Sequence, residues 1–230
     1  MSLYAIGDLH LSISSDKPMD IFGNLWEEHM GKLHKSFSRL SDEDVTVICG
    51  DLSWGMDLSQ AKDDLLFVES LPGKKIILKG NHDYWWTTMA KTNKFFLENS
   101  ISSIDIMHNS SFVYGDNTAI CGTRGWFYEE ENRSDHDKKI LRREVARLET
   151  SLKSAGDKDK YVFLHYPPKY GGYECSDFLD LFKKYNVKYC VYAHIHGKSL
   201  RNIFEGEYRG TIYKCVSADN VDFTPQMILE

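Results

Sequence analysis

The sequence predicts an α/β fold, and three observations support this prediction. Short apolar runs bounded by turn residues recur along the chain, as expected for buried strands. Stretches with the 3.6-residue period of an amphipathic helix lie between these runs, so strands and helices alternate. The length of 230 residues and the hydrophobic content of 42% suffice for a large core, and we expect residues 1–230 to form a single domain.

The predicted strands are the apolar runs themselves. They occupy residues 3–6, 45–49, 75–78, 119–121, 161–164 and 189–192. After residue 189 the pattern turns to β, with Gly206 and Gly210 as turn candidates. We therefore expect the chain to end in antiparallel strands rather than in another helix.

Helices are predicted where apolar residues follow a helical period. One apolar stripe covers residues 22–40 and a second covers residues 58–68. A third series lies in the strongly charged segment 126–160 and consists of Ile140, Leu141, Val145, Leu148 and Leu152. We expect a surface amphipathic helix in this segment, as an insertion or a cap over a site. Its basic residues alternate with glutamates, which favours a solvated face over a nucleic-acid contact.

Composition limits the classes of function. The net charge of -6 disfavours sequence-independent binding to nucleic acids, which depends on lysine and arginine. The five cysteines form no CxxC pair, so neither a disulfide framework nor a zinc finger is predicted. No apolar run approaches the ~20 residues of a membrane helix, and the N-terminus lacks the pattern of a signal peptide. We therefore expect a cytoplasmic protein without a membrane partner.

Residues with metal-binding side chains stand directly after the predicted strands. They are Asp8 and His10, then Asp51, then Asn81, His82 and Asp83, then His165, and finally His194 and His196. In an open α/β sheet, ligands bind at the carboxyl ends of the strands, where the loops converge. A single histidine or aspartate at such a position is usually a turn residue, but this many of them predict a metal centre.

The spacing within two of these clusters also favours metal binding. In Asp8-Leu9-His10 and in His194-Ile195-His196 one residue separates the polar pair, so an extended backbone points both side chains to the same side. Carboxylate oxygen together with imidazole nitrogen favours manganese, iron or zinc over magnesium. Two divalent cations facing Asp8 and Asp51 would leave a positive centre that attracts an anionic phosphate. Two such metals activate a water and neutralise phosphoryl charge.

These clusters resemble a known family. Asp8-Leu9-His10, Gly50-Asp51, Gly80-Asn81-His82-Asp83, His165 and Ala193-His194-Ile195-His196 are similar, in order, to the five signature blocks of the calcineurin-like metallophosphoesterases. Neighbouring stretches, such as Gly50 to Trp54, resemble a bacterial subgroup of predicted phosphohydrolases. The last block usually begins with glycine, and Ala193 stands in its place here. The added methyl group calls into question how closely the backbone approaches at that point.

The resemblance implies a fold, a set of ligands and two catalytic residues. The fold would be a four-layer α-β-β-α sandwich of two mixed sheets, the metallo-dependent phosphatase fold. Asp8, His10 and His196 would hold one metal, Asn81, His165 and His194 the other, and Asp51 would bridge them. His82 would assist the leaving group, and Asp83 would orient the His82 imidazole.

The remaining candidate residues have two interpretations each. Arg124 follows the run 119–121 and either binds a phosphate oxygen or pairs with a surface carboxylate. Trp85 and Trp86 either stack on an aromatic leaving group or belong to the core, and the core is favoured. The other histidines lack a ligand context and are interpreted as structural or solvated; they are His29, His34, His108 and His136.

The sequence therefore favours a two-metal phosphoester hydrolase. A hydroxide held between the metals would attack the phosphorus of a phosphomonoester or phosphodiester, in a small molecule or a nucleotide. A nuclease with the same metal centre is an alternative, which a basic channel to the site would support. A non-catalytic scaffold of the same fold is a third possibility, although such a protein could dispense with the ligands that this chain retains. The sequence pattern does not distinguish a monomer from an oligomer.

Overall fold

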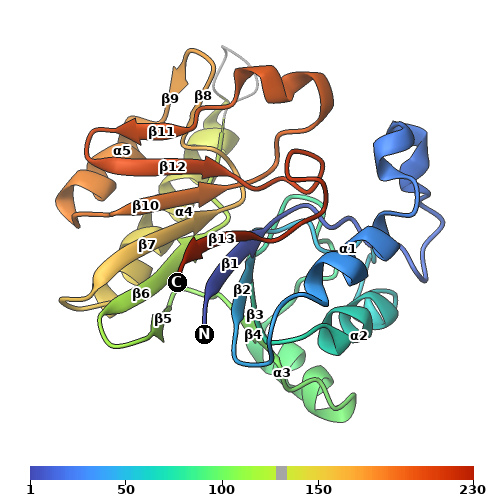
Figure 1. Cartoon of the computed structure of the whole chain (residues 1–230). Helices are drawn as coiled ribbons and strands as arrows, with labels where there is room; N and C mark the ends of the chain where they lie inside the picture. The colour runs from blue at the N-terminus through green and yellow to red at the C-terminus, as the bar shows by residue number, and fades with distance from the viewer. Residues whose placement is uncertain (128–133) are drawn as a thin grey trace.

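The computed structural model describes residues 1–127 and 134–230 of the chain. Two large mixed β-sheets pack face to face, and helices cover the outer face of each sheet (Figure 1). The structure therefore has four layers in the order α-β-β-α, and this confirms the predicted fold class.

The first sheet has the strand order β13-β1-β2-β3-β4. Its strands are β1 (Leu3–Ile6), β2 (Val45–Ile48), β3 (Lys74–Ile77), β4 (Ile104–Ile106) and β13 (Gln226–Leu229). Strands β1 to β4 run parallel, whereas β13 pairs with β1 in the antiparallel sense. The carboxyl ends of β1, β2 and β3 therefore lie side by side at one edge of the sheet.

The second sheet has the strand order β11-β12-β10-β7-β6-β5. Its strands are β5 (Ser111–Tyr114), β6 (Thr118–Thr123), β7 (Asp159–Leu164), β10 (Tyr189–Tyr192), β11 (Gly206–Tyr208) and β12 (Thr211–Cys215). The four central strands are parallel, and the two edge strands are antiparallel to their neighbours. A separate two-stranded sheet joins β8 (Lys169–Tyr170) to β9 (Tyr173–Glu174).

Successive side chains of each strand point alternately to the two faces of its sheet, and both faces are buried. Leu3 and Val47 of the first sheet lie in one buried cluster with Phe163 of β7, which is the layer between the sheets. The neighbouring residues Ile6 and Ile48 instead lie in the cluster beneath the helices. Successive side chains of a strand point to opposite faces, so a four-residue strand contributes to two core layers.

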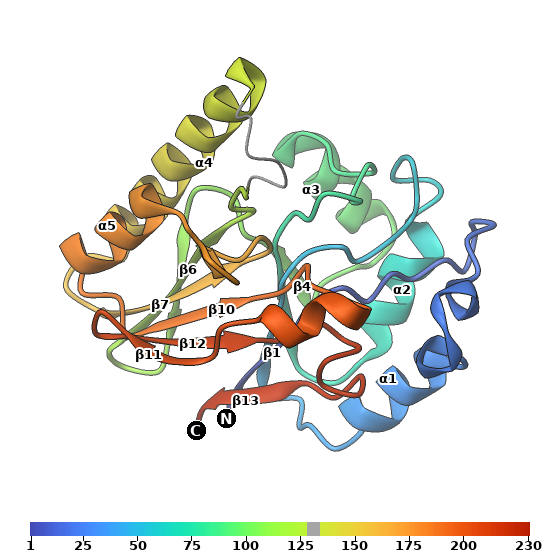
Figure 2. The same cartoon turned by 90° about the horizontal axis from the view of Figure 1, so that it is seen from above.

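Three helices cover the outer face of the first sheet, and two cover the second (Figure 2). The first three are α1 (His29–Phe37), α2 (Lys62–Ser70) and α3 (Met89–Glu98), and the other two are α4 (Asp135–Ser154) and α5 (Ser176–Lys184). In the described part of the chain, no helix is long and apolar enough to cross a membrane.

Helix α4 is a layer of the fold rather than the expected insertion or cap. It connects β6 to the parallel neighbour β7, and its residues Leu148 and Leu152 are fully buried against the second sheet. The helix begins with a capping box in which the Ser134 hydroxyl accepts a hydrogen bond from the Asp137 amide. Its many charged residues favour an insertion in the sequence pattern, although one of them, Glu144, is buried. The part of the expected segment at 128–133 lies outside the described residues.

The helix predicted over residues 22–40 is wrong in its first half. Residues Met19–Phe22 and Asn24–Trp26 form the short 3-10 helices η1 and η2, and α1 begins only at His29. Gly23 has a φ of 118° and Glu28 a φ of 51°, so the backbone leaves the helical region at both positions. The apolar residues of this stretch therefore do not form one core-facing stripe.

The prediction of antiparallel strands at the end of the chain is confirmed for β11 with β12 and for β13 with β1. Strands β11 and β12 form an antiparallel hairpin whose turn contains Arg209 and Gly210, both with positive φ. Strand β12, however, pairs with β10 in the parallel sense, which the sequence pattern did not indicate. Helices α3 and α5 and strands β4 and β5 were also not predicted.

Candidate metal centre

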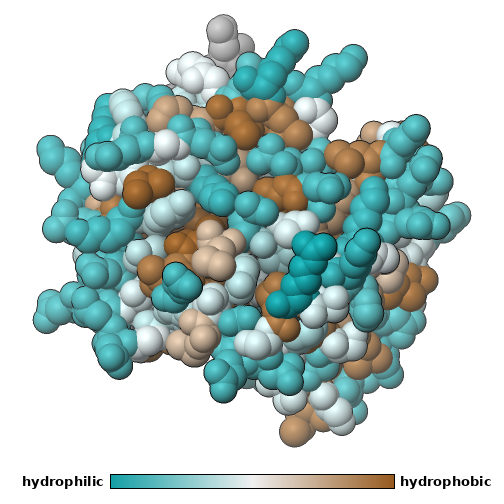
Figure 3. All heavy atoms as spheres, viewed as in Figure 1, coloured by the Kyte–Doolittle hydropathy of each residue, from teal (hydrophilic) through white to brown (hydrophobic). Residues whose placement is uncertain are grey.

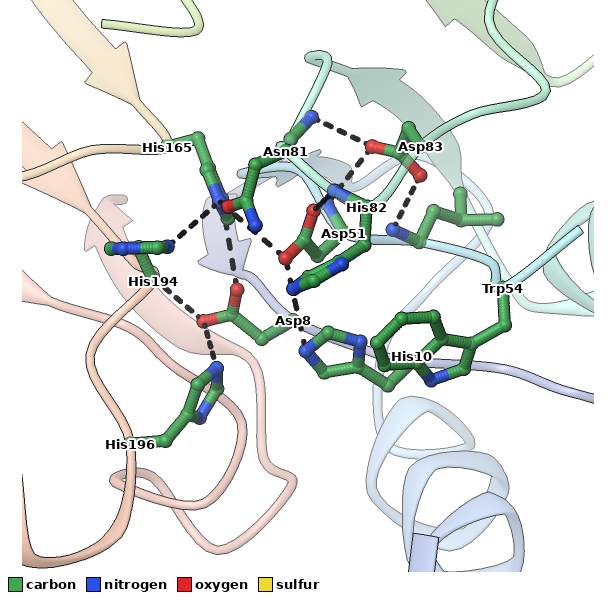
Figure 4. Close-up of polar contacts among 12 residues, drawn as sticks. Asp8, His10, Asp51, Trp54, Asn81, His82, Asp83, His165, His194 and His196 are labelled. Carbon is green, nitrogen blue, oxygen red and sulfur yellow. Dashed lines mark hydrogen bonds and ion pairs between the residues drawn. The ribbon is translucent and has the colours of Figure 1, made fainter. Parts of the chain in front are cut away.

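The predicted ligand side chains converge at the carboxyl ends of strands from both sheets (Figure 4). Asp8 and His10 follow β1, Asp51 follows β2, Asn81 follows β3, His165 follows β7, and His194 and His196 follow β10. Hydrogen bonds join the strand ends: the Asp8 amide donates to the Gly50 carbonyl, and the His194 amide donates to the Asp8 carboxylate. Residues as far apart in the sequence as Asp8 and His196 thus face one small volume.

The first ligand group consists of Asp8, His10 and His196. One ligand atom of each residue lies within 4.8 Å of the others. The Nε2 atom of His196 is 3.5 Å from an Asp8 carboxylate oxygen. Asp8 is fully buried and His10 is 5% exposed, so solvent does not satisfy these groups.

The second ligand group consists of Asp51, His165 and His194, whose ligand atoms meet the same 4.8 Å limit. Asn81 joins it, because its Oδ1 atom is 2.6 Å from Nε2 of His165. Asp51 also connects the two groups. Its Oδ2 atom lies 3.5 Å from Nε2 of His165 and 3.8 Å from Nε2 of His10.

Hydrogen bonds behind the ligands set the orientation of two imidazoles. Nδ1 of His165 donates to the Cys49 carbonyl oxygen at 2.9 Å, which leaves Nε2 with its lone pair toward the centre. Nδ1 of His196 donates to Oδ1 of Asp219 at 2.8 Å, and Nε2 again faces the centre. Such outer hydrogen bonds are typical of histidine ligands to metals.

Asp219 was not found from the sequence. It lies shortly after β12, and its second oxygen accepts a hydrogen bond from the Gly197 amide. Because β12 runs parallel to β10, its carboxyl end reaches the same edge as the predicted ligands. Asp219, like the predicted ligands, is a polar residue that follows a strand. It was missed because β12 was expected to be antiparallel, which would place its carboxyl end at the opposite edge of the sheet.

Four of the ligand residues have a left-handed backbone. The φ angles are 59° at Asp8, 46° at His10, 51° at Asp51 and 76° at His194. Non-glycine residues in this region are uncommon, and such conformations cluster at functional sites. Close packing supports the loops, because a Cβ atom at Gly80 would overlap the carboxylate of Asp51.

The charges in the centre compete strongly in the absence of cations. Burial and the neighbouring carboxylates of Asp83 and Asp8 raise the pKa of Asp51 well above its ordinary value. Burial and the His165 imidazole lower the pKa of His194 to about 3. Although burial opposes it, the Asp8 and Asp219 carboxylates raise the pKa of His196 to about 10. Carboxylates in this environment thus favour a bound positive charge.

Several buried polar atoms in the described centre have no hydrogen-bond partner. They include Oδ1 of Asp8 and Nε2 of His196. A buried polar atom without a partner is costly, and such atoms are few in native proteins. Two clusters of carboxylate and imidazole ligands, the first of which holds these unsatisfied atoms, fit two divalent cations with nitrogen and oxygen ligands.

The expected role of Asp83 is wrong. Its carboxylate accepts hydrogen bonds from the backbone amides of Asp51, Leu52, Ser53 and Gly80 and from Nε1 of Trp85. Its oxygens are therefore fully engaged, and Nδ1 of His82 has no hydrogen-bond partner in the described part of the chain. Asp83 positions the loops after β2 and β3, and does not orient the His82 imidazole.

His82 lies beside the ligands, at the wall of an open cavity. Its amide donates a 2.7 Å hydrogen bond to Asp51, and its ring centroid is 4.5 Å from that of Trp54. The Trp54 indole also stacks on His10 at 5.0 Å, so one aromatic side chain packs against both imidazoles. Burial and the His165 imidazole lower the pKa of His82.

The side chain of Arg124 lines a different cavity. Its carbonyl oxygen accepts hydrogen bonds from the amides of His165 and Tyr166, but its guanidinium lies over the Trp126 ring at 5.0 Å. None of the metal-ligand candidates lines the cavity that Arg124 enters, on the evidence of the described residues. The expected contact with a phosphate held at the metal centre therefore has no geometric support.

Trp85 and Trp86 occupy different environments, as expected of adjacent aromatic residues. Trp85 is buried in the core with 2% exposure, whereas the half-buried Trp86 lines the same cavity as Arg124. Among the described residues, the four other histidines join neither ligand group. His29 is buried in α1, and His34, His108 and His136 are exposed.

The extra methyl group of Ala193 is accommodated by a glycine. Ala193 is fully buried where β10 ends beside β1, and a Cβ atom on Gly7 would overlap its Cβ. The Gly7 amide donates to the Val216 carbonyl, and the Ala218 amide donates to Gly7. The backbone at Ala193 therefore still lies close to the neighbouring chain, because the residue opposite it, Gly7 at the end of β1, has no side chain.

The chain is similar to known proteins over most of its length. The sequence model described as calcineurin-like phosphoesterase matches residues 1–198. No curated protein matches the chain. Among solved structures, the protein of unknown function AQ665 from Aquifex aeolicus is similar at 16% identity, with a TM-score of 0.50 and coverage of 98% of this chain and 95% of that one. A second solved structure has 12% identity, a TM-score of 0.54 and coverage of 92% and 88%. Both likenesses concern the fold.

Proposed function

Because the chain belongs to the calcineurin-like phosphoesterase family, we propose that it hydrolyses phosphate esters with two bound divalent metal ions. The observation that carries this proposal is the position of Asp51. Its Oδ2 atom lies between the two ligand groups, 3.8 Å from His10 and 3.5 Å from His165. A carboxylate in this position is suited to bridge two cations.

The proposed ligand sets follow the two clusters. Asp8, His10 and His196 hold one cation, while Asn81, His165 and His194 hold the other, with Asp51 shared between them. This donor set favours manganese, iron or zinc over magnesium. Bound in this way, the ions supply an activated water and neutralise negative charge on the phosphoryl oxygens.

His82 is proposed to act on the leaving group. Its side chain stands next to the ligands but is not needed for either cluster, and it lines the cavity beside His10 and His196. As the bond from phosphorus to the departing oxygen breaks, an imidazolium at this position donates its proton to that oxygen. Trp54 holds the ring by packing, since no carboxylate partner binds Nδ1 in the described structure.

The cavity beside His82 favours an ester with an apolar leaving group. It has a volume of about 470 Å³, and its lining includes Phe22, Leu25 and Trp26. Phe22 is 64% exposed and Leu25 is 43% exposed, so apolar surface is available to a ligand. Figure 3 shows apolar residues gathered in patches on an otherwise mainly hydrophilic face. A small-molecule ester or a nucleotide with an exposed ring fits this lining.

A nuclease finds no support in the same cavity. No lysine or arginine is among its described lining residues, whereas a nuclease needs cations along the path of the phosphate backbone. A non-catalytic scaffold is disfavoured by the complete ligand set and by the retention of His82.

The proposal is tested by elemental analysis together with turnover of two esters. The purified chain should contain up to two equivalents of a transition metal and should hydrolyse p-nitrophenyl phosphate or its bis-ester. Asp51→Asn should lose metal and activity together. Asp222→Asn, an exposed carboxylate outside both clusters, is the matched control and should retain both. A metal-loaded chain inactive on both esters and on naphthyl phosphate would contradict the proposal.

A further inference from the structure

A second cavity lies apart from the metal centre. It has a volume of about 540 Å³, which is within the range of small-molecule sites. Its walls come from the loops after β3, β4 and β6, from the first residues of α3 and from one face of α4. In the described structure, none of the metal-ligand candidates is among its lining residues.

The lining of this cavity is strongly basic. Lys79, Arg124, Arg143 and Arg147 provide four cations, and Glu144 provides the one carboxylate among the described lining residues. The chain as a whole has a net charge of -6, so this concentration of positive charge runs against the overall composition. A cavity with one sign of charge on its walls attracts ligands of the opposite sign.

The buried carboxylate balances only part of this charge. Glu144 accepts hydrogen bonds from the Thr123 hydroxyl at 2.6 Å and from Arg147 at 2.8 Å, and its Oε1 lies 3.4 Å from Nε of Arg143. In the described part of the chain, Lys79 and Arg124 have no ion pair with a carboxylate. Burial, followed by repulsion from Arg124, lowers the pKa of Lys79. Among the described residues, Lys79 and Arg124 therefore have no carboxylate counter-ion, whereas Arg143 and Arg147 share Glu144.

Other groups in the lining are suited to a phosphate. Thr88 caps the N-terminus of α3, and both Thr88 and Met89 border the cavity, so the positive end of the helix dipole opens onto it. Thr87 and Asn109 add side-chain donors. Trp86 and Met107 supply apolar surface beside them.

We propose that this cavity binds a small molecule with two or more phosphate groups, at a site distinct from the metal centre. Several phosphate oxygens are needed to match cations on different walls, and guanidinium groups bind them in bidentate fashion. The cavity volume of about 540 Å³ favours a small oligophosphate over a nucleic-acid strand. The inference rests on the lining charges and does not depend on the proposed hydrolysis.

Titration calorimetry with inorganic pyrophosphate tests the proposal on the full chain with its metals. Lys79→Gln and Arg143→Gln should each weaken binding by about tenfold, since each removes a charged hydrogen-bond donor. Arg142→Gln is the matched control, because Arg142 is the exposed neighbour of Arg143 on the same helix and does not line the cavity. It should bind within twofold of the wild type. Thermal melts of each variant separate lost binding from lost folding.

A second arm distinguishes this cavity from the metal centre. Asp51→Asn should retain pyrophosphate binding, although it removes the proposed bridging ligand. Loss of binding in Asp51→Asn, or unchanged binding in both Lys79→Gln and Arg143→Gln, would overturn the proposal. So would tight binding of a single-stranded oligonucleotide by a chain that does not bind pyrophosphate. The failure of the proposed hydrolysis would leave these binding results unaffected.

Discussion

The metal centre and the basic cavity show two opposite ways of burying charge in one chain. At the candidate metal centre, Asp8 and Asp51 are buried among imidazoles, and Oδ1 of Asp8 and Nε2 of His196 have no hydrogen-bond partner among the described residues. In the basic cavity, cations surround one buried carboxylate, Glu144, which is fully satisfied by its neighbours. An ion of the opposite sign would balance the charge of each region. The net charge of -6 therefore describes neither site.

Of the tests that distinguish the two regions, removal of the metals should have the largest effect. A chelator should abolish ester hydrolysis and lower the melting temperature, because ions bound to the folded state stabilise it, by about 2.7 kcal/mol at 100 times the dissociation constant. Pyrophosphate binding in the basic cavity should persist after the chelator is dialysed away. Scanning calorimetry and an ester assay measure the two effects. Undiminished activity in a chain shown to be metal-free would contradict the assignment.

Replacing His82 should act on catalysis alone. His82→Gln should lower turnover by about 10² to 10⁴ fold, the usual contribution of a positioned proton donor. Metal content should stay at the wild-type value, since neither cluster needs His82. His108→Gln is the matched control in the lining of the basic cavity and should change turnover by less than twofold. Loss of the metals in His82→Gln would show that His82 is a ligand instead.

Replacing Asp219 should have a smaller effect, a loss of metal affinity that arises through His196. Asp219→Ala removes the acceptor for Nδ1 of His196 and should weaken metal binding by about 10 to 100 fold. Asp219→Asn keeps an acceptor oxygen and should lose less. Competition with a metal-sensitive dye measures the affinity of each variant. Equal affinities for Asp219→Ala and the wild type would mean that the hydrogen bond has no influence on the centre.

The contact between Gly7 and Ala193 should affect stability the least. Gly7→Ala should destabilise the chain by about 1–3 kcal/mol, the range for an overpacked core. The double variant Gly7→Ala, Ala193→Gly should recover much of this loss, because the two Cβ positions overlap. Urea unfolding of the single and double variants measures the coupling. Additive losses in the double variant would show that the strain lies elsewhere.

The sequence predicted which side chains come together at the candidate metal centre, because the signal is local. Each ligand stands within a few residues of a short apolar strand, and parallel strands bring their carboxyl ends together without further information. The order of the four layers followed from the resemblance. Asp83 had a recognisable position, but its role depends on amides of Asp51 and Leu52, about 30 positions away, which no local pattern encodes.

Other features depended on long-range geometry or on single backbone angles. Asp219 was missed because the parallel pairing of β12 with β10 is not visible in the strand sequence. The helix over residues 22–40 failed because an apolar period does not reveal a left-handed residue such as Glu28. Lys79 follows β3 and Arg143 lies in α4, and only the fold brings both residues to the same cavity.

The left-handed backbone at Asp8, Asp51 and His194 constrains how this chain can change during evolution. Aspartate, asparagine and histidine tolerate that conformation better than other residues with a Cβ atom, and glycine tolerates it best. The residue type at each position therefore meets two requirements: its side chain is a proposed metal ligand, and its backbone adopts a left-handed conformation. A related protein that no longer binds metals should still need a left-handed backbone at these three positions. We expect glycine or asparagine there, because valine or isoleucine would distort the backbone after the strands.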